Sequence, residues 1–328
     1  MVYRCKDNIS IVTIRIAIWC ERILSPVILS IGWSGNFMLY RTMQNKLYRS
    51  THMSVFFKAL AIVHSILLLI DLGRWLEALG LINIYKVTDC GWLFFVKKSA
   101  QQISNYIMLL HNLDRSVFVM CPDISLKYFD QKCCKIYCIL IAIITILIMS
   151  HWPYILHFSS TYYLVSGTPC KYHHHSEMWG NVGWPIFYNL FGIAIPFIGI
   201  LVCTSLLIRF VRRSRKRIGR RLSHNQRKGL RNTIILSLFY IVCSFPFALL
   251  QCLTRLVNFS KSCRIHTLWF LTNSILFQLL CFGYSVTFYL LASQSSIIRE
   301  NLLMILRNEN IEMIIRQAKV CESPTEAI

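Results

Sequence analysis

Seven long apolar stretches, separated by short polar and basic segments, constrain the fold of this chain more than any other feature of its sequence. They lie near residues 16–42, 52–76, 88–121, 132–156, 182–212, 228–254 and 267–291. Because roughly 20 apolar residues in a helix cross a bilayer core about 30 Å thick, each stretch is long enough to span a membrane. The pattern predicts an all-α fold, a bundle of seven transmembrane helices over residues 16–291.

The composition also favours a membrane protein. Hydrophobic residues make up 55% of the 328 residues and the mean hydropathy is +0.51, whereas a soluble domain is usually about 45–50% apolar. Charged residues interrupt two of the apolar stretches. The first carries Glu21 and Arg22, and the third carries Lys97 and Lys98. The first ten residues lack the apolar run of a cleaved signal peptide. We therefore expect the first helix to act as an uncleaved signal anchor.

The formal net charge of +21 raises the alternative of a nucleic-acid-binding protein, because basic proteins neutralise phosphates. The placement of the charge argues against it. Residues Arg209–Arg231 contain eleven Lys or Arg and no acid, and they lie between two apolar stretches. Such a block is typical of a cytoplasmic loop of a membrane protein. We therefore expect the chain to contact a lipid bilayer and no nucleic acid.

The distribution of charge also predicts an orientation. Most of the 35 Lys and Arg residues fall in alternate connecting segments or after the last stretch, which places residues 1–15 outside the cell and the C-terminus in the cytoplasm. Two glycosylation sequons, at Asn8 and Asn258, fall on the expected outer side. Residues 293–307 are amphipathic and predict a short helix on the membrane surface, followed by a polar cytoplasmic tail at 308–328.

The third stretch carries the most specific motif. Cys90 stands near its start, Leu113-Asp114-Arg115 near its end, and Pro122 seven residues beyond the arginine. The 25 residues from Cys90 to Arg115 would extend about 37 Å as a helix, which is enough to cross the membrane. This arrangement resembles the rhodopsin-like family of G-protein-coupled receptors.

Further positions match that family in order along the chain. They are Gly35-Asn36 in the first stretch, Pro196 in the fifth, Pro246 in the sixth and Tyr289 at the end of the seventh. The Asn36 amide is expected to hydrogen-bond between helices, where no water competes. The two prolines each free backbone carbonyls and are expected to create hinges.

The resemblance implies a multi-pass plasma-membrane receptor that binds an extracellular ligand and activates a heterotrimeric G protein. Asp114 and Arg115 would form an ion pair that opens on activation, and together with Tyr289 they would make up the switch and the G-protein-coupling site. Cys90 and Cys170 would form an extracellular disulfide. The resemblance implies no enzymatic activity, and we expect neither a metal ion nor a cofactor.

Shorter patterns resemble one group within that family, the invertebrate neuropeptide receptors of the FMRFamide type. The patterns are Arg74-Trp75 after the second helix, Ser150-His151-Trp152 at the end of the fourth, Trp184-Pro185 ahead of the fifth-helix proline, and Ile298-Arg299 after the seventh helix. This narrower resemblance makes a peptide the favoured ligand.

The expected ligand site has a basic mouth. Its candidate residues are Arg74, Lys97, Lys98, Gln101, Phe247, Gln251 and Arg255. Lys97 occupies the position at which amine receptors of the family carry an aspartate, and it would repel an amine. A peptide with acidic groups or a small anion would suit this mouth, whereas a basic amidated peptide would need Asp71, Glu77 or Asp89 nearby. Alternatively, Lys97 and Lys98 extend to the membrane surface and never meet a ligand.

Three positions depart from the family pattern. His64 replaces the second-helix aspartate, Ser244 the sixth-helix tryptophan, and Ser285-Val286 the seventh-helix Asn-Pro pair. These changes leave the apolar stretches intact, but they concern activation and predict the loss of the family's usual sodium site. A chemosensory receptor for small molecules, or a divergent receptor with weak or constitutive coupling, is therefore a second hypothesis.

A seven-helix transporter or intramembrane enzyme is the hypothesis from a different class. Transporters need intramembrane acids or broken helices near the bilayer midplane, and residues 178–299 contain no Asp or Glu. Intramembrane hydrolysis would need paired catalytic acids, a serine dyad or a His-Glu metal motif, and the sequence contains none of them. The sequence therefore favours a receptor.

Overall fold

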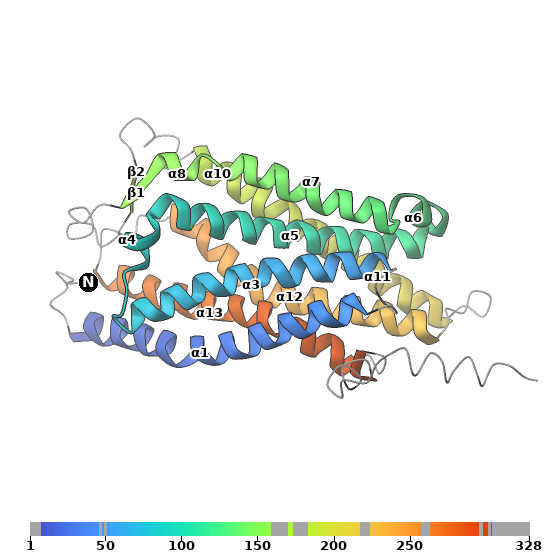
Figure 1. The fold of residues 1–328 in the computed structure, drawn as a ribbon, viewed down its shortest axis with the longest axis horizontal. Helices are drawn as coiled ribbons and strands as arrows, with labels where there is room; N and C mark the ends of the chain where they lie inside the picture. The colour runs from blue at the N-terminus through green and yellow to red at the C-terminus, as the bar shows by residue number, and fades with distance from the viewer. Residues whose placement is uncertain are drawn as a thin grey trace, which may run out of the picture.

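Long helices run side by side along the longest axis of the protein in the computed structural model, and they form a bundle (Figure 1). The structure describes residues 8–45, 48, 51–158, 170–172, 183–216, 224–256, 263–294, 298–300 and 303. Its long helices are α1 (Asn8–Gln44), α3 (His52–Ala78), α5 (Cys90–Met120), α7 (Gln131–Met149), α11 (Ile195–Lys216), α12 (His224–Leu256) and α13 (Cys263–Gln294). The predicted all-α seven-helix bundle is confirmed.

Shorter elements connect these helices. They are α4 (Ile84–Thr88), α6 (Pro122–Tyr128), α8 (Trp152–Ile155), α10 (Trp184–Phe187), the π-helical segment η3 (Tyr188–Ala194), and the strands β1 (Leu156–Phe158) and β2 (Cys170–Tyr172). The two strands pair in antiparallel fashion, with Leu156 opposite Tyr172. Hydropathy did not predict this hairpin, because three-residue strands leave too little periodicity in the sequence.

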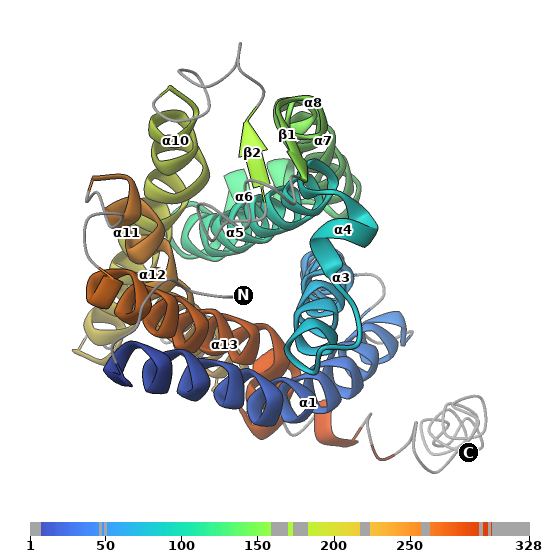
Figure 2. The ribbon, with the colours of Figure 1, turned by 90° about the vertical axis from the view of Figure 1, so that its left-hand side faces the viewer.

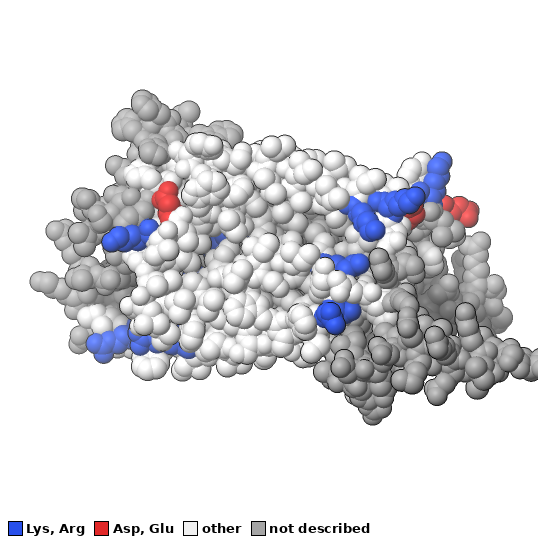
Figure 3. Space-filling view, in the orientation of Figure 1, with Lys and Arg blue, Asp and Glu red and all other residues white. Residues whose placement is uncertain are grey.

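Five of the described helical segments are both long and apolar enough to cross a membrane. They are His52–Ala78, Gln131–Ile155, Tyr188–Arg213, Gly229–Leu253 and Thr267–Gln294. The helices α1 and α5 are also long, with 37 and 31 residues, but they carry the charged pairs Glu21-Arg22 and Lys97-Lys98. On the face shown in Figure 3, charged side chains lie toward the two ends of the molecule and an uncharged band separates them. Such a band is what a lipid-facing surface requires.

The helix α5 lies between the two sides of the bundle. It packs against α3, α7, α11 and α12, whereas α1 packs against α13 and α3. In the end-on view of Figure 2, α1 and α13 run along one side, α7 and α10 lie on the opposite side, and α5 lies between them. Side chains on α5 can therefore contact helices that are far apart in the sequence.

The fourth predicted stretch, 132–156, is interrupted near its end. The helix α7 ends at Met149, and the single turn α8 follows before β1 begins at Leu156. Pro153 explains the break, because a proline has no N–H and its ring clashes with the carbonyl four residues earlier, here that of Met149.

The fifth predicted stretch, 182–212, consists of α10, η3 and α11 in succession. Pro196 is the second residue of α11, and it cannot donate to the carbonyl of Gly192. In the wider turn before it, the Ile195 N–H donates to the carbonyl of Leu190, five residues back. The hinge expected at Pro196 therefore takes the form of a π-helical segment, a feature that often marks functional sites.

The first helix is longer than the sequence suggested. The helix α1 begins at Asn8, inside the segment 1–15 that we expected to precede the first span. The first sequon therefore stands at the start of this helix. The second sequon, at Asn258, lies outside the described residues.

The C-terminal predictions fall largely on residues that the structure does not describe. Of the predicted surface helix 293–307, Ser293 and Gln294 continue α13, and residues 298–300 and 303 are helical. The rest of that segment, and the whole tail at 308–328, lies outside the described residues. The surface helix and the cytoplasmic tail therefore remain predictions.

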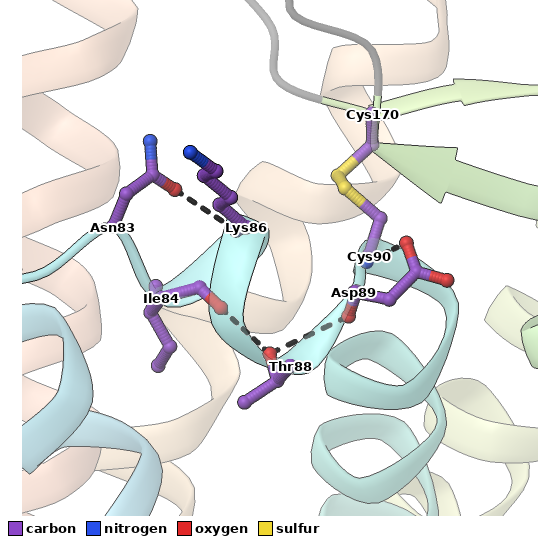
Figure 4. The surroundings of a disulfide bond; sticks show 7 residues. All are labelled: Asn83, Ile84, Lys86, Thr88, Asp89, Cys90 and Cys170. Carbon is purple, nitrogen blue, oxygen red and sulfur yellow. Dashed lines mark hydrogen bonds between the residues drawn. A yellow bond between two sulfur atoms is a disulfide. The ribbon is translucent and has the colours of Figure 1, made fainter.

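A disulfide joins Cys90 to Cys170, with their Cα atoms 5.7 Å apart. Cys90 is the first residue of α5, and the Asp89 carboxylate accepts a hydrogen bond from its N–H at 2.7 Å (Figure 4). Cys170 begins β2 and lies opposite Phe158 of β1. This is the pair that the family resemblance implied. We call this end of the bundle the disulfide end, and the opposite end the Arg115 end.

A glycine allows α5 to approach the chain after α7 closely. A Cβ atom at Gly91 would lie 2.6 Å from the Cα of Pro153, 2.7 Å from the carbonyl oxygen of Trp152 and 2.8 Å from that of Leu156. All three are backbone atoms, which cannot move aside as the end of a flexible side chain can. Only glycine fits at this position without a shift of the backbone.

In the Gly35-Asn36 pair of α1, the glycine makes a close contact with α13 and the asparagine does not make the expected hydrogen bond. A Cβ at Gly35 would lie 2.8 Å from the ring of Tyr289 and 2.9 Å from the carbonyl oxygen of Ser285, so this glycine permits close contact between α1 and α13. The Asn36 side chain is buried, but its amide has no hydrogen-bond partner among the described residues. The interhelical hydrogen bond expected from Asn36 is therefore not present, and Gly35 supports the contact instead.

We predict that Gly91→Ala destabilises the protein by about 1–3 kcal/mol, because the added methyl group overpacks against backbone atoms. The matched control is Gly229→Ala in α12, where a Cβ would meet no atom within 4 Å and alanine is the better helix former. Thermal unfolding of the purified protein in detergent measures both. Equal Tm values for Gly91→Ala and the unsubstituted protein would contradict the packing described here.

Candidate functional site

At the Arg115 end, α5 presents an ion pair between neighbouring residues. The Arg115 Nη2 atom lies 3.1 Å from Oδ2 of Asp114, and the side chains are 14% and 0% exposed. A third group, His52 of α3, places its Nε2 atom 3.2 Å from the same carboxylate oxygen and 2.6 Å from Arg115 Nη2. The two residues of the expected switch therefore meet each other, and a histidine from another helix joins them.

Hydrogen bonds beside this pair hold α5 to two other helices. Ser237 of α12 donates to the Asn112 side-chain oxygen at 2.6 Å, and Ser116 donates to the backbone carbonyl of Cys203 in α11 at 3.3 Å. Both contacts lie within one helical turn of Arg115. The arginine is thus surrounded by interhelical contacts that would have to change if the Arg115 end of the bundle opened.

Tyr289, the third residue of the expected switch, lies apart from Arg115. Its hydroxyl is 2.9 Å from the Ser34 hydroxyl and donates to the carbonyl of Ile31 at 3.3 Å, so it contacts α1. The side chain is 41% exposed. The structure therefore brings together Asp114 and Arg115 but not Tyr289.

At the disulfide end, two of the predicted ligand-binding cations share one aromatic ring. Arg74 lies over Phe277 at 4.2 Å from the ring centroid, and Lys97 lies over the same ring at 4.4 Å. Lys97 is also 5.7 Å from the centroid of Phe247. Three predicted residues, from α3, α5 and α12, therefore meet at a phenylalanine of α13 that the sequence did not single out.

Acidic and polar side chains surround Arg74 on the other side. Arg74 forms an ion pair with Glu21 of α1, and Ser274 of α13 donates to Glu21 at 2.8 Å. Asp71 is fully buried and accepts from Ser25 at 3.3 Å and from Gln278 at 3.1 Å. Arg74 is thus neutralised within the protein, by an acid 53 positions away in the sequence.

The other predicted ligand-binding residues face different neighbours. Lys98 lies 4.4 Å from the ring centroid of Tyr188, whose hydroxyl donates to Gln101 at 3.4 Å. Gln251 donates to Asn273 at 3.1 Å. Arg255 belongs to α12, and its side chain lies outside the described part of the chain. Among the predicted residues whose side chains the structure describes, Arg74 and Lys97 therefore share the Phe277 ring, and Lys98 and Gln101 share contact with Tyr188.

With this geometry in place, the comparison with known families decides the class of protein. A family model described as 7 transmembrane receptor (rhodopsin family) matches residues 35–287.

The chain belongs to the rhodopsin family of seven-transmembrane receptors. It is therefore a multi-pass plasma-membrane protein, a receptor and not an enzyme, that receives an extracellular ligand and couples to a heterotrimeric G protein. No curated protein sequence matches the chain.

In this rhodopsin-family receptor, the residues that depart from the family pattern make interhelical contacts of their own. His64 of α3 is 1% exposed, its Nε2 lies 2.9 Å from the Ser104 hydroxyl of α5, and its ring stacks on Tyr284 of α13 at 4.5 Å. Ser285 donates to the carbonyl of Ile28 in α1 at 3.0 Å. His64 and Ser285 thus each join two or more helices through buried contacts.

Asn105 of α5 links three helices in the middle of the receptor. It donates to the carbonyl of Gly192 at 2.9 Å and accepts from the Tyr240 hydroxyl of α12 at 2.5 Å. The next residue, Tyr106, donates to the carbonyl of Phe191 at 2.7 Å. In an α-helix the N–H of residue 196 would donate to the carbonyl of Gly192, and in a π-helix to that of Phe191. Pro196 has no N–H, so it can donate to neither. Two α5 side chains thus donate to the two carbonyls that the missing N–H of Pro196 could have reached.

Sequence analysis missed His52, Asn105, Tyr240 and the acidic partner Glu21. Glu21 and Asn105 did carry a signal, because polar side chains within a predicted membrane span usually face the bundle interior and pair there. Tyr240 and His52 carried no signal in the hydropathy or in any motif. Their partners lie 135 and 63 positions away in the chain, so only the folded structure identifies them.

We predict that Tyr240→Phe destabilises the receptor by about 0.6–1.7 kcal/mol, from the average to the maximum found for hydrogen bonds between helices inside a membrane bundle. The ring of Tyr240 remains, so the change removes only the hydroxyl, which donates to Asn105 and lies 3.5 Å from the Ser104 hydroxyl. The control is Tyr154→Phe, at a side chain that is 78% exposed. A Tm for Tyr240→Phe in detergent equal to that of the control would show that this hydrogen bond contributes nothing.

Proposed function

We propose that this receptor binds a peptide ligand at the disulfide end, outside the cell, and signals through Arg115 at the cytoplasmic end. The disulfide Cys90–Cys170 supports the orientation, because disulfides form on the oxidising side of a membrane. The basic segment Arg209–Arg231 supports it too, since such segments stay in the cytoplasm. The middle of that segment, 217–223, lies outside the described residues.

One observation carries the coupling part of the proposal. The helix α5 bears the disulfide cysteine at its first residue and the buried Asp114–Arg115 pair near its last turn. A guanidinium that is held by an acid at the cytoplasmic end can be released to a protein partner, because only a few interactions hold it in place. We propose that the ligand favours the released form and that Arg115 then contacts the G protein.

We predict that Arg115→Ala abolishes ligand-stimulated G-protein activation in cells, because it removes the group that would contact the partner. The matched control is Arg41→Ala, an exposed arginine in the last turn of α1 at the same end of the bundle, which should retain the response. Surface expression of each variant is measured with an epitope tag. A full response from Arg115→Ala at normal surface expression would contradict the proposed coupling site.

The charges at the disulfide end favour an acidic group on the ligand. Arg74 already has Glu21 as its partner, and the Asp71 carboxylate is buried against Ser25 and Gln278. Lys97 contacts two aromatic rings and has no acidic group within ion-pair distance in the described part of the chain. A ligand carboxylate would supply that missing partner. Of the three acids that a basic amidated peptide would need, Asp71 is buried and the Asp89 carboxylate accepts from the N–H of Cys90, so the partly buried Glu77 would have to serve as its partner.

We predict that Lys97→Gln weakens the response to an acidic peptide about 10-fold or more, since a hydrogen bond to a charged group contributes about 1.5–3 kcal/mol. Lys97→Arg keeps the positive charge and should retain most of the potency. The assay is a concentration–response curve for G-protein activation, with a peptide library that contains both acidic and amidated basic members. A potent basic peptide that is insensitive to Lys97→Gln would contradict the acidic-ligand proposal.

The same assay, run with this peptide library and with a second library of small organic molecules, separates the two ligand classes that the sequence left open. Activation by a peptide would support the neuropeptide-receptor proposal. Activation by small organic molecules, with no response to any peptide, would favour the chemosensory alternative instead. High activity without ligand, abolished by Arg115→Ala, would indicate constitutive coupling.

A further inference from the structure

His52 contacts the Asp114–Arg115 pair from a different helix. It is the first residue of α3, whereas the pair belongs to the last turns of α5. The His52 side chain is 30% exposed and the Asp114 side chain is fully buried. The imidazole therefore lies at the edge of the bundle, between the buried ion pair and the space that a cytoplasmic partner would enter.

The chemistry of the shared nitrogen determines which partner His52 bonds. A guanidinium donates hydrogen bonds and cannot accept them. A hydrogen bond from Arg115 Nη2 at 2.6 Å requires Nε2 of His52 to be the acceptor, with the ring proton on Nδ1, and in this tautomer the 3.2 Å approach of Nε2 to the Asp114 carboxylate oxygen is not a hydrogen bond. The Arg115 side chain is thus held between two acceptors, the Asp114 carboxylate and the His52 imidazole.

An aromatic contact one turn deeper holds the two helices at this distance. His111 of α5 packs against Phe56 and Phe57 of α3, with ring centroids 5.9 and 5.1 Å apart. His52 and Phe56 are four residues apart on α3, and His111 and Arg115 are four apart on α5, so each pair lies on one face of its helix. The contact between His52 and Arg115 is therefore fixed by packed helices rather than by a loop.

We propose that His52 is a positioning residue that holds Arg115 in its resting orientation and thereby suppresses coupling in the absence of ligand. This inference rests on the proposed function, because it concerns G-protein activation through Arg115. Release of Arg115 requires that it leave both acceptors. Hydrogen bonds that involve a charged group are stronger than those between neutral groups, so the loss of His52 shifts the equilibrium toward the released form.

Three substitutions distinguish hydrogen bonding from packing. His52→Phe keeps an aromatic ring but has no acceptor, and it should raise ligand-independent G-protein activation about tenfold. His52→Ala should do the same. His52→Gln retains an oxygen that can accept from Arg115, and its activation should stay near that of the unsubstituted receptor. All values are normalised to surface expression.

The outcome for His52→Phe decides the proposal. A rise in His52→Phe with a normal level in His52→Gln would support it, because a purely structural role would be rescued by the ring and not by the amide. An unchanged level in His52→Phe, or an equal rise in His52→Gln, would overturn it.

A double-mutant cycle tests the contact without any G protein. In thermal unfolding of the purified receptor in detergent, His52→Phe should lower Tm, and the shift should be clearly smaller in an Arg115→Ala background. Equal shifts in the two backgrounds would show that the residues do not interact and would overturn the inference. Unequal shifts, with no G-protein activation by any variant, would support the contact and contradict the proposed coupling instead.

Discussion

The polar face of α5 is the feature on which the rest of this structure depends. Inside a membrane water is scarce, so polar side chains gain stability by pairing with groups on other helices. Ser104 contacts α3, Asn105 contacts η3 and α12, and Asn112 contacts α12. Near the end of the helix, Arg115 contacts α3 and Ser116 contacts α11. One helix thus fixes the relative positions of most of the bundle through hydrogen bonds whose geometry is specific.

This face also connects the two ends at which the receptor meets its partners. At the disulfide end, Lys97 contacts rings of α12 and α13. At the other end, Arg115 is held by Asp114 and His52. The contacts of Asn105 lie between them and include the carbonyl that Pro196 leaves free. A ligand that shifts α5 relative to α12 or η3 would disturb these hydrogen bonds.

Much of the fold could be predicted from the sequence, because hydropathy and the spacing of basic segments follow directly from the physics of the bilayer. The disulfide could be expected only from the family resemblance. Helix ends were less predictable. The break before Pro153 and the π-helical segment before Pro196 each depend on one proline. Within the site, Asp114 and Arg115 are neighbours in the sequence and were found. The partners Glu21 and His52 come from other helices, so the sequence could mark Glu21 as a polar residue within a span but could not identify either pairing.

Hydrogen bonds of Asn105 and Asn112 join α5 to α12, and we infer that these helices separate when Arg115 is released to the G protein. The most direct test is the distance between spin labels at Met120 of α5 and Arg231 of α12, both exposed at the Arg115 end. Noncanonical amino acids should carry the labels, because the described chain contains nine free cysteines. Double electron–electron resonance is measured with and without ligand and heterotrimeric G protein. The account predicts a longer distance in the complex. An unchanged distance distribution, with the G protein bound, would contradict it.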